Sequence, residues 1–288
     1  MPYPPGGATD LIGRQLAEGL ARRLGQSVIV DNRAGAAGAV GVAATASSAP
    51  DGYTVVLAGS NNVAVDPQQE RLPYRPATDL VPVAPAAALP YVVFAHPSFA
   101  PNTIAELIAA AKRAPGTINF ASSGIGGPPH MASELLRAMA GIDVVHVPYR
   151  GAVPAVTDVV GGRVQFMTGD VNTALPFLQS GQLKAIATTG RQRMALLPNV
   201  PTVAESGLPG YEAEGWFGIF APARTPEDVV ARLARDIDSA MQDPAYVERM
   251  AGFGGRPMRM PPAEFQRFIA SETRIRSDLI RTNGIALE

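Results

Sequence analysis

The chain has 288 residues, of which 47% are hydrophobic and 17% charged, and its formal net charge at pH 7 is −1. This composition is typical of a well-packed globular protein with one large domain or two ordinary ones, and it excludes an intrinsically disordered chain. The near-neutral charge provides no broad basic surface for nucleic acid or acidic membranes, and the absence of cysteine excludes disulfides, thiolate catalysis and cysteine-ligated zinc.

The first predicted element is a turn followed by an amphipathic helix. Residues 2–10 read PYPPGGATD, and apolar residues then recur at helical spacing. We expect Thr9 or Asp10 to cap the helix, because its side-chain oxygen can accept a hydrogen bond from a backbone N–H of the first turn. Gly6 and Gly7 lack a Cβ atom, so another molecule can approach their backbone closely. The stretch favours either an anion site at a helix N-terminus or a capped turn without a ligand.

Short apolar runs alternate with helical patterns along most of the chain. The runs are rich in β-branched residues and predict buried strands at 27–31, 53–59, 91–95, 117–122, 143–149, 163–168 and 183–189. Helical periodicity predicts helices near 9–24, 38–48, 103–113, 129–140, 152–161, 226–243 and 262–283. This alternation predicts an α/β fold with largely parallel sheets.

A second glycine-rich turn has the same design as the first. Residues 122–127 read SSGIGG, follow a predicted strand and lead into a helix that opens with Pro128 and Pro129. Two such turns in a chain of two-domain length suggest a cleft into which each lobe points one helix N-terminus. A structural role for each turn separately is the alternative.

Nucleotide and catalytic motifs are weak in this sequence. The glycines of residues 35–41 have the spacing GxxGxxG and not that of a dinucleotide fold, and no phosphate-binding P-loop motif occurs. Ser123, His130 and Asp170 have suitable identities for a hydrolase, but a GxSxG elbow is missing. We expect His130 to act in hydrogen bonding or packing. The histidines are scattered without an HExxH motif, so we expect neither a metal nor another cofactor.

Polar residues also follow other predicted strands. Ser60 and Asn61 come directly after the strand at 53–59, and Asp170 follows the strand at 163–168. The carboxyl ends of parallel strands face the ligand crevice in open α/β sheets, so these residues are candidate contacts. Asp170 would repel an anion unless it accepts a hydrogen bond from a donor on the ligand or from a water.

Several stretches together identify a resemblance to a known family. PYPPGGATD, FASSGIGG, VPYRGAVPAVTDVVGGRV and PTVAESGLPGYE occur in the order found in the solute receptors of tripartite tricarboxylate transporters, also called Bug-type periplasmic binding proteins. The resemblance covers essentially the whole chain. It implies a two-lobed Venus-flytrap periplasmic-binding-protein fold of type II-like character, with mixed sheets flanked by helices. Lobe one would comprise residues 1–100 and 222–288, and lobe two residues 101–221.

The resemblance also implies a function without catalysis. Such receptors capture a small organic carboxylate in the interlobe cleft: a dicarboxylate, a tricarboxylate, an acidic amino acid or an aromatic acid. They act in uptake through membrane permease subunits or in sensing, and they are periplasmic, although no leader is visible ahead of residue 2. A small-acid hydrolase is the alternative function. The implied ligand contacts are Tyr3, Gly7, Ala8, Thr9, Asp10, Ser60, Asn61, Ser123, Gly124, Gly126, Gly127, His130 and Asp170.

This chain departs from the family pattern at two positions. The family often has serine or threonine where this chain has Gly127, so one hydroxyl is lost. It also often has aspartate where this chain has Gln165, to which we assign a structural role.

Overall fold

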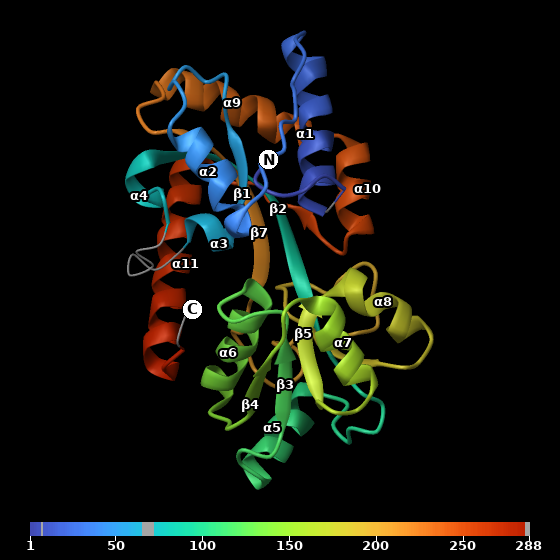
Figure 1. Ribbon diagram of the computed structural model, residues 1–288. Helices are drawn as coiled ribbons and strands as arrows, with labels where there is room; N and C mark the ends of the chain where they lie inside the picture. Colours follow the sequence, from blue (N-terminus) through green and yellow to red (C-terminus); the bar gives the residue numbers. More distant parts are fainter. Residues whose placement is uncertain (7, 65–71, 286–288) are drawn as a thin grey trace. The chain divides into compact units, whose positions relative to one another are not determined.

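The computed structural model describes residues 1–6, 8–64 and 72–285, which form two compact α/β units (Figure 1). Unit 1 comprises Met1–Ala88 and Trp216–Ser277, and unit 2 comprises Leu89–Gly215 and the residues from Asp278 onward. The boundaries therefore fall inside two long strands, β2 (Leu80–Ala95) and β7 (Glu214–Pro222). The lobes that the resemblance implies, with boundaries near residues 100 and 222, stay a prediction.

The strands of unit 1 form an antiparallel arrangement. Strand β1 (Val56–Gly59) pairs with β7 in a register that places Val56 opposite Phe220, β7 is hydrogen-bonded to β2, and β8 (Arg256–Pro257) pairs with β2. Trp216 and Phe220 of β7 are buried and both lie against the ring of Phe265, at centroid distances of 5.6 Å. This aromatic cluster anchors the C-terminal helix on the strands of unit 1.

Helices in unit 1 come from both ends of the chain. They are α1 (Ala8–Leu24), α2 (Ala39–Ala46), α3 (Ser60–Val63), α4 (Pro76–Asp79), α9 (Glu227–Ala240), α10 (Pro244–Gly252) and α11 (Pro262–Asn283), with a 3₁₀ turn at Ala36–Gly38 before α2. The glycines of the GxxGxxG stretch allow close packing. A Cβ atom on Gly41 would lie 2.6 Å from the Pro2 Cα, and one on Gly38 would lie 3.0 Å from the Asn62 side chain. These glycines therefore have a packing role.

Unit 2 is built on a mixed sheet with the strand order β2-β5-β3-β4. Strand β3 (Asn119–Ser122) is parallel to β4 (Val145–Pro148) and to β5 (Phe166–Asp170), while β5 and β6 (Lys184–Thr188) pair antiparallel with β2. The helices are α5 (Ile104–Arg113), α6 (Pro128–Ala140), α7 (Ala152–Val160) and α8 (Val171–Gln179). Because β3, β4 and β5 run in one direction, their carboxyl ends lie at the same edge of the sheet, and α6, α7 and α8 begin there.

The structure corrects two expectations about strands. Residues 27–31 have no regular secondary structure, and Ile29 is 86% exposed. The Met1 amino group donates to the Asp31 carbonyl (2.7 Å), and the Met1 carbonyl accepts from the Arg33 N–H (2.8 Å). These two bonds do not form a strand ladder. The sheets are mixed and not largely parallel, because only strands joined by helical crossovers must run in the same direction.

Gln165 has the structural role expected for it. Its side-chain oxygen accepts a hydrogen bond from the Asn119 N–H at 2.8 Å, at the start of β3. None of the helices in the described part of the chain combines the length and the apolar character that a membrane crossing requires.

Candidate functional site

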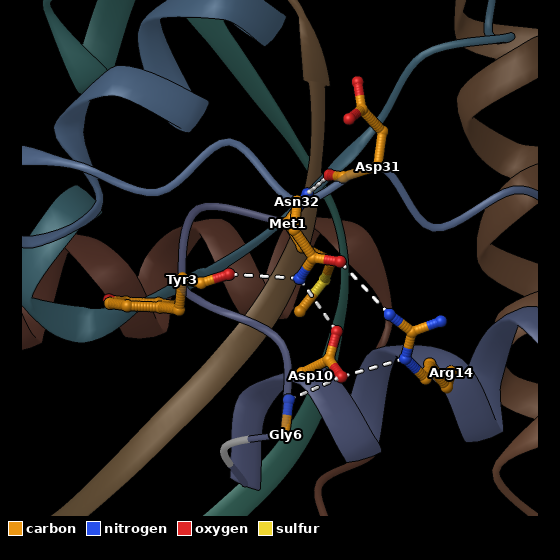
Figure 2. A network of polar contacts seen from close by, with 7 residues as sticks. All are labelled: Met1, Tyr3, Gly6, Asp10, Arg14, Asp31 and Asn32. Atoms are coloured by element: carbon orange, nitrogen blue, oxygen red, sulfur yellow. Dashed lines mark hydrogen bonds and ion pairs between the residues drawn. The ribbon is translucent and has the colours of Figure 1, made fainter.

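The first glycine-rich turn is fastened to α1 by Asp10 (Figure 2). Helix α1 begins at Ala8, so the prediction that Thr9 or Asp10 caps it from outside was wrong: both lie in its first turn. The Asp10 carboxylate instead reaches back and accepts a hydrogen bond from the Gly6 N–H at 3.0 Å. A backbone N–H of the turn is thereby satisfied from within the helix. Gly7 lies outside the described residues.

Asp10 is also the centre of a buried polar network (Figure 2). Its carboxylate accepts hydrogen bonds from Arg14 Nε and from Asn32 Nδ2, each at 2.8 Å, and Asn32 Nδ2 also donates to the Tyr3 carbonyl at 3.1 Å. The bond from Arg14 lowers the pKa of Asp10 to about 2, although burial acts in the opposite direction. The carboxylate is thus ionised and turned toward the protein, where it holds the turn.

Tyr3 connects the turn to the carboxyl end of β1. Its hydroxyl lies 2.6 Å from Asn62 Oδ1 and 3.1 Å from Asn61 Oδ1, and burial raises its pKa. Asn61 and Asn62 belong to α3, which begins at the buried Ser60. Unit 1 therefore brings together Tyr3, Ser60 and Asn61 among the residues predicted from the sequence.

The second glycine-rich turn follows β3 in unit 2 and is held by His130. Gly124 and Gly126 have φ angles of +153° and +72°, which favour glycine. The Gly126 N–H donates to Nδ1 of His130, a buried residue of α6, at 3.0 Å. The hydrogen-bonding role expected for His130 is therefore confirmed. Gly127 precedes α6 with φ −64° and without a side-chain cap, because it has no side chain.

A pair of stacked imidazoles lies beneath this turn. The rings of His130 and His146 are 4.0 Å apart and nearly parallel, and His146 Nε2 lies 2.6 Å from Ser122 Oγ at the end of β3. Burial, and secondarily the neighbouring His130, lowers the pKa of His146 to about 4. Nε2 of His130 lies 3.6 Å from Glu134, whose carboxylate is also 2.9 Å from Arg137. The turn therefore lies on two stacked imidazoles and an adjacent ion pair of α6.

The geometry gives no support to the hydrolase alternative. Within the part of the chain that the structure describes, no hydrogen bond joins Ser123, His130 and Asp170, and His130 Nδ1 is occupied by Gly126. The serine–histidine pair that does form is Ser122–His146, and an imidazole with a pKa of about 4 is a weak general base at neutral pH. No group of three metal-ligating side chains occurs among the described residues.

Further polar residues lie at the same edge of the unit 2 sheet. The backbone N–H groups of Tyr149 and Gly151 donate to the carbonyls of Ser122 and Ser123, at 3.0 and 3.1 Å, and so place Arg150 beside the second turn. Asp170 ends β5 on the other side of β3 and precedes α8. It is exposed at the surface, yet the protein around its carboxyl reduces solvation and raises its pKa. Sequence reasoning had not selected Arg150, although the residue directly follows the predicted strand at 143–149.

The chain is similar to receptors of one transporter family. The model of the family described as "Tripartite tricarboxylate transporter family receptor" matches residues 12–285. Protein BugT of Bordetella pertussis is 37% identical over 293 residues, which cover 100% of this chain and 89% of that protein.

Solved structures show the same similarity in three dimensions. The structure of R. palustris Rpa4515 with adipate has a TM-score of 0.79 and 30% identity, and covers 99% of this chain and 95% of its own. MatC (Rpa3494) from Rhodopseudomonas palustris with bound malate has a TM-score of 0.73 and 29% identity over 96% of both chains. The periplasmic binding protein BugD has a TM-score of 0.75 and 30% identity, with 100% of this chain and 97% of BugD covered. The expected periplasmic-binding-protein fold is thus confirmed.

Proposed function

Because the chain belongs to the tripartite tricarboxylate transporter family of receptors, which bind solutes and are not enzymes, we propose that it captures a small organic carboxylate for uptake or sensing. Relatives that hold adipate and malate support this ligand class. The observation that carries the proposal is the glycine-rich turn at residues 122–127, which is held by His130 and has open space around Gly124.

In unit 2 we assign the contacts to the outer part of this turn. Ser123 is half-buried, and its hydroxyl is a donor for a carboxylate oxygen. An added Cβ atom would meet nothing within 4 Å at Gly124 and only the Gly124 carbonyl at Gly127, so the backbone there is open to close approach. Pro128 and Pro129 carry no N–H, so α6 offers fewer donors than an ordinary helix N-terminus. Gly126 and His130 then position the turn, because their hydrogen-bonding atoms face each other.

In unit 1 we assign the contacts to the beginning of α1 and to the end of β1. Ala8 and Thr9 occupy the first turn of α1, where backbone N–H groups have no acceptor within the helix. Tyr3, Ser60 and Asn61 add polar groups, and Gly7 completes the set carried over from the family. Asp10 serves this site by holding the turn, since its carboxylate is already occupied.

We propose that the carboxylate of the ligand is held by neutral donors. Charge-assisted hydrogen bonds of this kind are strong without a full positive charge. Asp170 would accept a hydrogen bond from a hydroxyl or ammonium group of the ligand or from a water. We also propose that the protein is periplasmic, as BugD is. It would deliver its ligand to the membrane permease of a tripartite transporter.

A thermal-shift screen followed by calorimetry tests this function. The panel contains mono-, di- and tricarboxylates, acidic amino acids and aromatic acids, with the matching amides as controls. A ligand at 100 times its dissociation constant stabilises the native state by about 2.7 kcal/mol. Ser123→Ala should weaken binding about 10-fold, while Ser180→Ala, an exposed serine at the other end of α8 from Asp170, should leave it unchanged. A panel in which no acid stabilises the protein would contradict the proposal.

A further inference from the structure

Arg150 is held against the second glycine-rich turn by its two neighbours in the chain. The N–H groups of Tyr149 and Gly151 donate to the carbonyls of Ser122 and Ser123, the last residue of β3 and the first residue of the turn. Gly151 has φ +112° and directs the chain from β4 into α7. The position of the Arg150 backbone is therefore tied to the turn on both sides.

The charge of Arg150 is not balanced within the described parts of the molecule. The residue is exposed, and its guanidinium makes no ion pair or hydrogen bond with the residues that the structure describes. The acid on the following helix, Asp158, is engaged by the Tyr149 hydroxyl and by Arg163, each at 2.6 Å. These two bonds lower the pKa of Asp158, which shows that the carboxylate is satisfied without Arg150.

Other basic groups near the two turns are not available as cations. Arg14 in unit 1 is bound to Asp10, and Arg137 in unit 2 is bound to Glu134. His146 is neutral at pH 7, because its pKa lies near 4. Arg150 thus supplies a full positive charge beside a turn whose other groups provide only partial charges.

The edge of the sheet is also polar from one side to the other. In the order β5-β3-β4, Asp170 ends β5, Ser122 ends β3 and is followed by Ser123, and Arg150 follows β4. Asp170 and Arg150 therefore belong to the segments on opposite sides of β3. If one carboxylate of a ligand is bound at the turn, a second carboxylate is attracted to the positive charge of Arg150. Asp170 does not attract it, because its side chain has only carboxyl oxygens.

We propose that Arg150 is a specificity-determining residue that binds a second carboxylate of the ligand, so that the receptor prefers dicarboxylates to monocarboxylates of the same length. The inference rests on the proposed function and adds a ligand class and a residue to it. A guanidinium can bind a carboxylate through two parallel hydrogen bonds, a geometry that an ammonium group does not reproduce.

Calorimetry with matched pairs of acids tests the inference. The pairs are succinate and butanoate, glutarate and pentanoate, and adipate and hexanoate, so that members of a pair differ only in the second carboxylate. The wild type should prefer the dicarboxylate of the tightest pair. Arg150→Gln should weaken its binding by about 10- to 100-fold and leave the monocarboxylate within about 2-fold. The dicarboxylate affinity of Arg150→Lys should lie between those of the wild type and Arg150→Gln. Arg113→Gln is the matched control, because Arg113 is an exposed arginine at the end of α5.

The possible failures are distinguishable. If the wild type binds none of the acids, the proposed function falls and the inference with it. If the wild type binds them but Arg150→Gln weakens both members of a pair equally, Arg150 contacts the common carboxylate or supports the fold, and the inference alone is overturned. An unchanged dicarboxylate affinity in Arg150→Gln overturns it as well. Thermal unfolding of each variant without ligand shows whether the fold is retained.

Discussion

Nδ1 of His130 accepts a hydrogen bond from the backbone N–H of Gly126, four residues earlier, at 3.0 Å. Both residues are buried, so the bond fixes the glycine-rich turn onto the first turn of α6. The turn therefore owes its shape to a side chain that points inward, and not to glycine alone.

Replacement of His130 by leucine should destabilise the protein and weaken ligand binding. Leucine preserves much of the volume but removes the bond that the buried Gly126 N–H donates to Nδ1, at a cost of about 1–3 kcal/mol in the free energy of unfolding. Urea denaturation measures this loss. His96→Leu is the control. The His96 ring is hydrogen-bonded to Ser98 near the surface, so its loss should cost less than about 1 kcal/mol. Equal losses in the two variants would contradict a special role for the His130–Gly126 bond.

Acidification should destabilise the protein through His146 well above the pH at which carboxylates titrate. The pKa of His146 in the folded protein is about 4, below its ordinary value of 6.5, so the unfolded chain takes up the proton first. The free energy of unfolding therefore falls as the pH is lowered from about 6.5 toward 4, by on the order of 2 kcal/mol after allowance for the partial exposure of the ring. Denaturation curves across this range measure the fall. His146→Gln should flatten this part of the profile, and a profile equally steep in that variant would refute the assignment.

Asp10→Asn should loosen the first turn. The substitution removes the negative charge that accepts hydrogen bonds from Gly6, Arg14 and Asn32, and it places an amide against the Arg14 guanidinium. We expect a loss of about 2 kcal/mol in unfolding free energy, measured by urea denaturation at pH 7. Asp31→Asn removes an exposed partner of Arg33 and should cost less than about 0.5 kcal/mol.

The stability difference between wild type and Asp10→Asn should depend on pH. The folded pKa of Asp10 is lowered to about 2, so its stabilisation is present above the ordinary carboxyl pKa and is lost as the pH falls toward 2. The difference between wild type and Asp10→Asn should therefore shrink in acid. A constant difference would show that the lost charge is not its cause.

Gly127→Ser should stabilise the protein modestly. The residue has φ −64° and precedes α6, and an added Cβ atom would meet only the Gly124 carbonyl, at 3.6 Å. A serine there can cap the helix and restricts the unfolded chain, which together are worth about 0.5 kcal/mol. Gly126→Ser is the contrasting variant, since φ +72° makes a side chain unfavourable by about 1 kcal/mol. Thermal unfolding of both variants should shift the midpoints in opposite directions, and shifts of the same sign would contradict this reading of the turn.

The helices were predictable because their apolar spacing and their end signals agree. Helix α6 begins with two prolines, and α5 has Thr103 as its N-cap, which accepts from the Glu106 N–H. Strand β7 was harder to predict because it contains Gly215 and Gly218. The structure shows why they are there: side chains at these positions would collide with the rings of Tyr91 and Phe265. Glycine is required at these positions by side chains that are remote in the sequence. The local spacing of apolar residues does not predict such contacts.

Strand β2 illustrates the same limit. Only residues 91–95 were predicted as strand, but the strand is continuous over Leu80–Ala95 and includes three prolines, Pro82, Pro85 and Pro90. Proline has a backbone angle close to that of a strand and is excluded only where its missing N–H would be required. Which N–H groups a strand needs depends on neighbours that are remote in the sequence.

The candidate site residues that directly follow a strand were predictable from the sequence. The residues whose role depends on contacts with distant parts of the chain were not. Ser60, Ser123 and Asp170 were selected because each follows a predicted strand. His146 and Arg150 were not, because their importance comes from the stacking on His130 and from the hydrogen bonds beside Arg150 that join the end of β4 to the turn.

The division of the chain has a consequence for biosynthesis. Unit 1 consists of Met1–Ala88 and Trp216–Ser277, whereas most of unit 2 is the continuous stretch Leu89–Gly215. During translation, β7, which pairs with β1, and the C-terminal aromatic residues packed with β1 emerge only after most of that stretch has been synthesised. The middle segment can therefore fold first, while the apolar residues of the N-terminal segment stay exposed until the C-terminal segment has been synthesised.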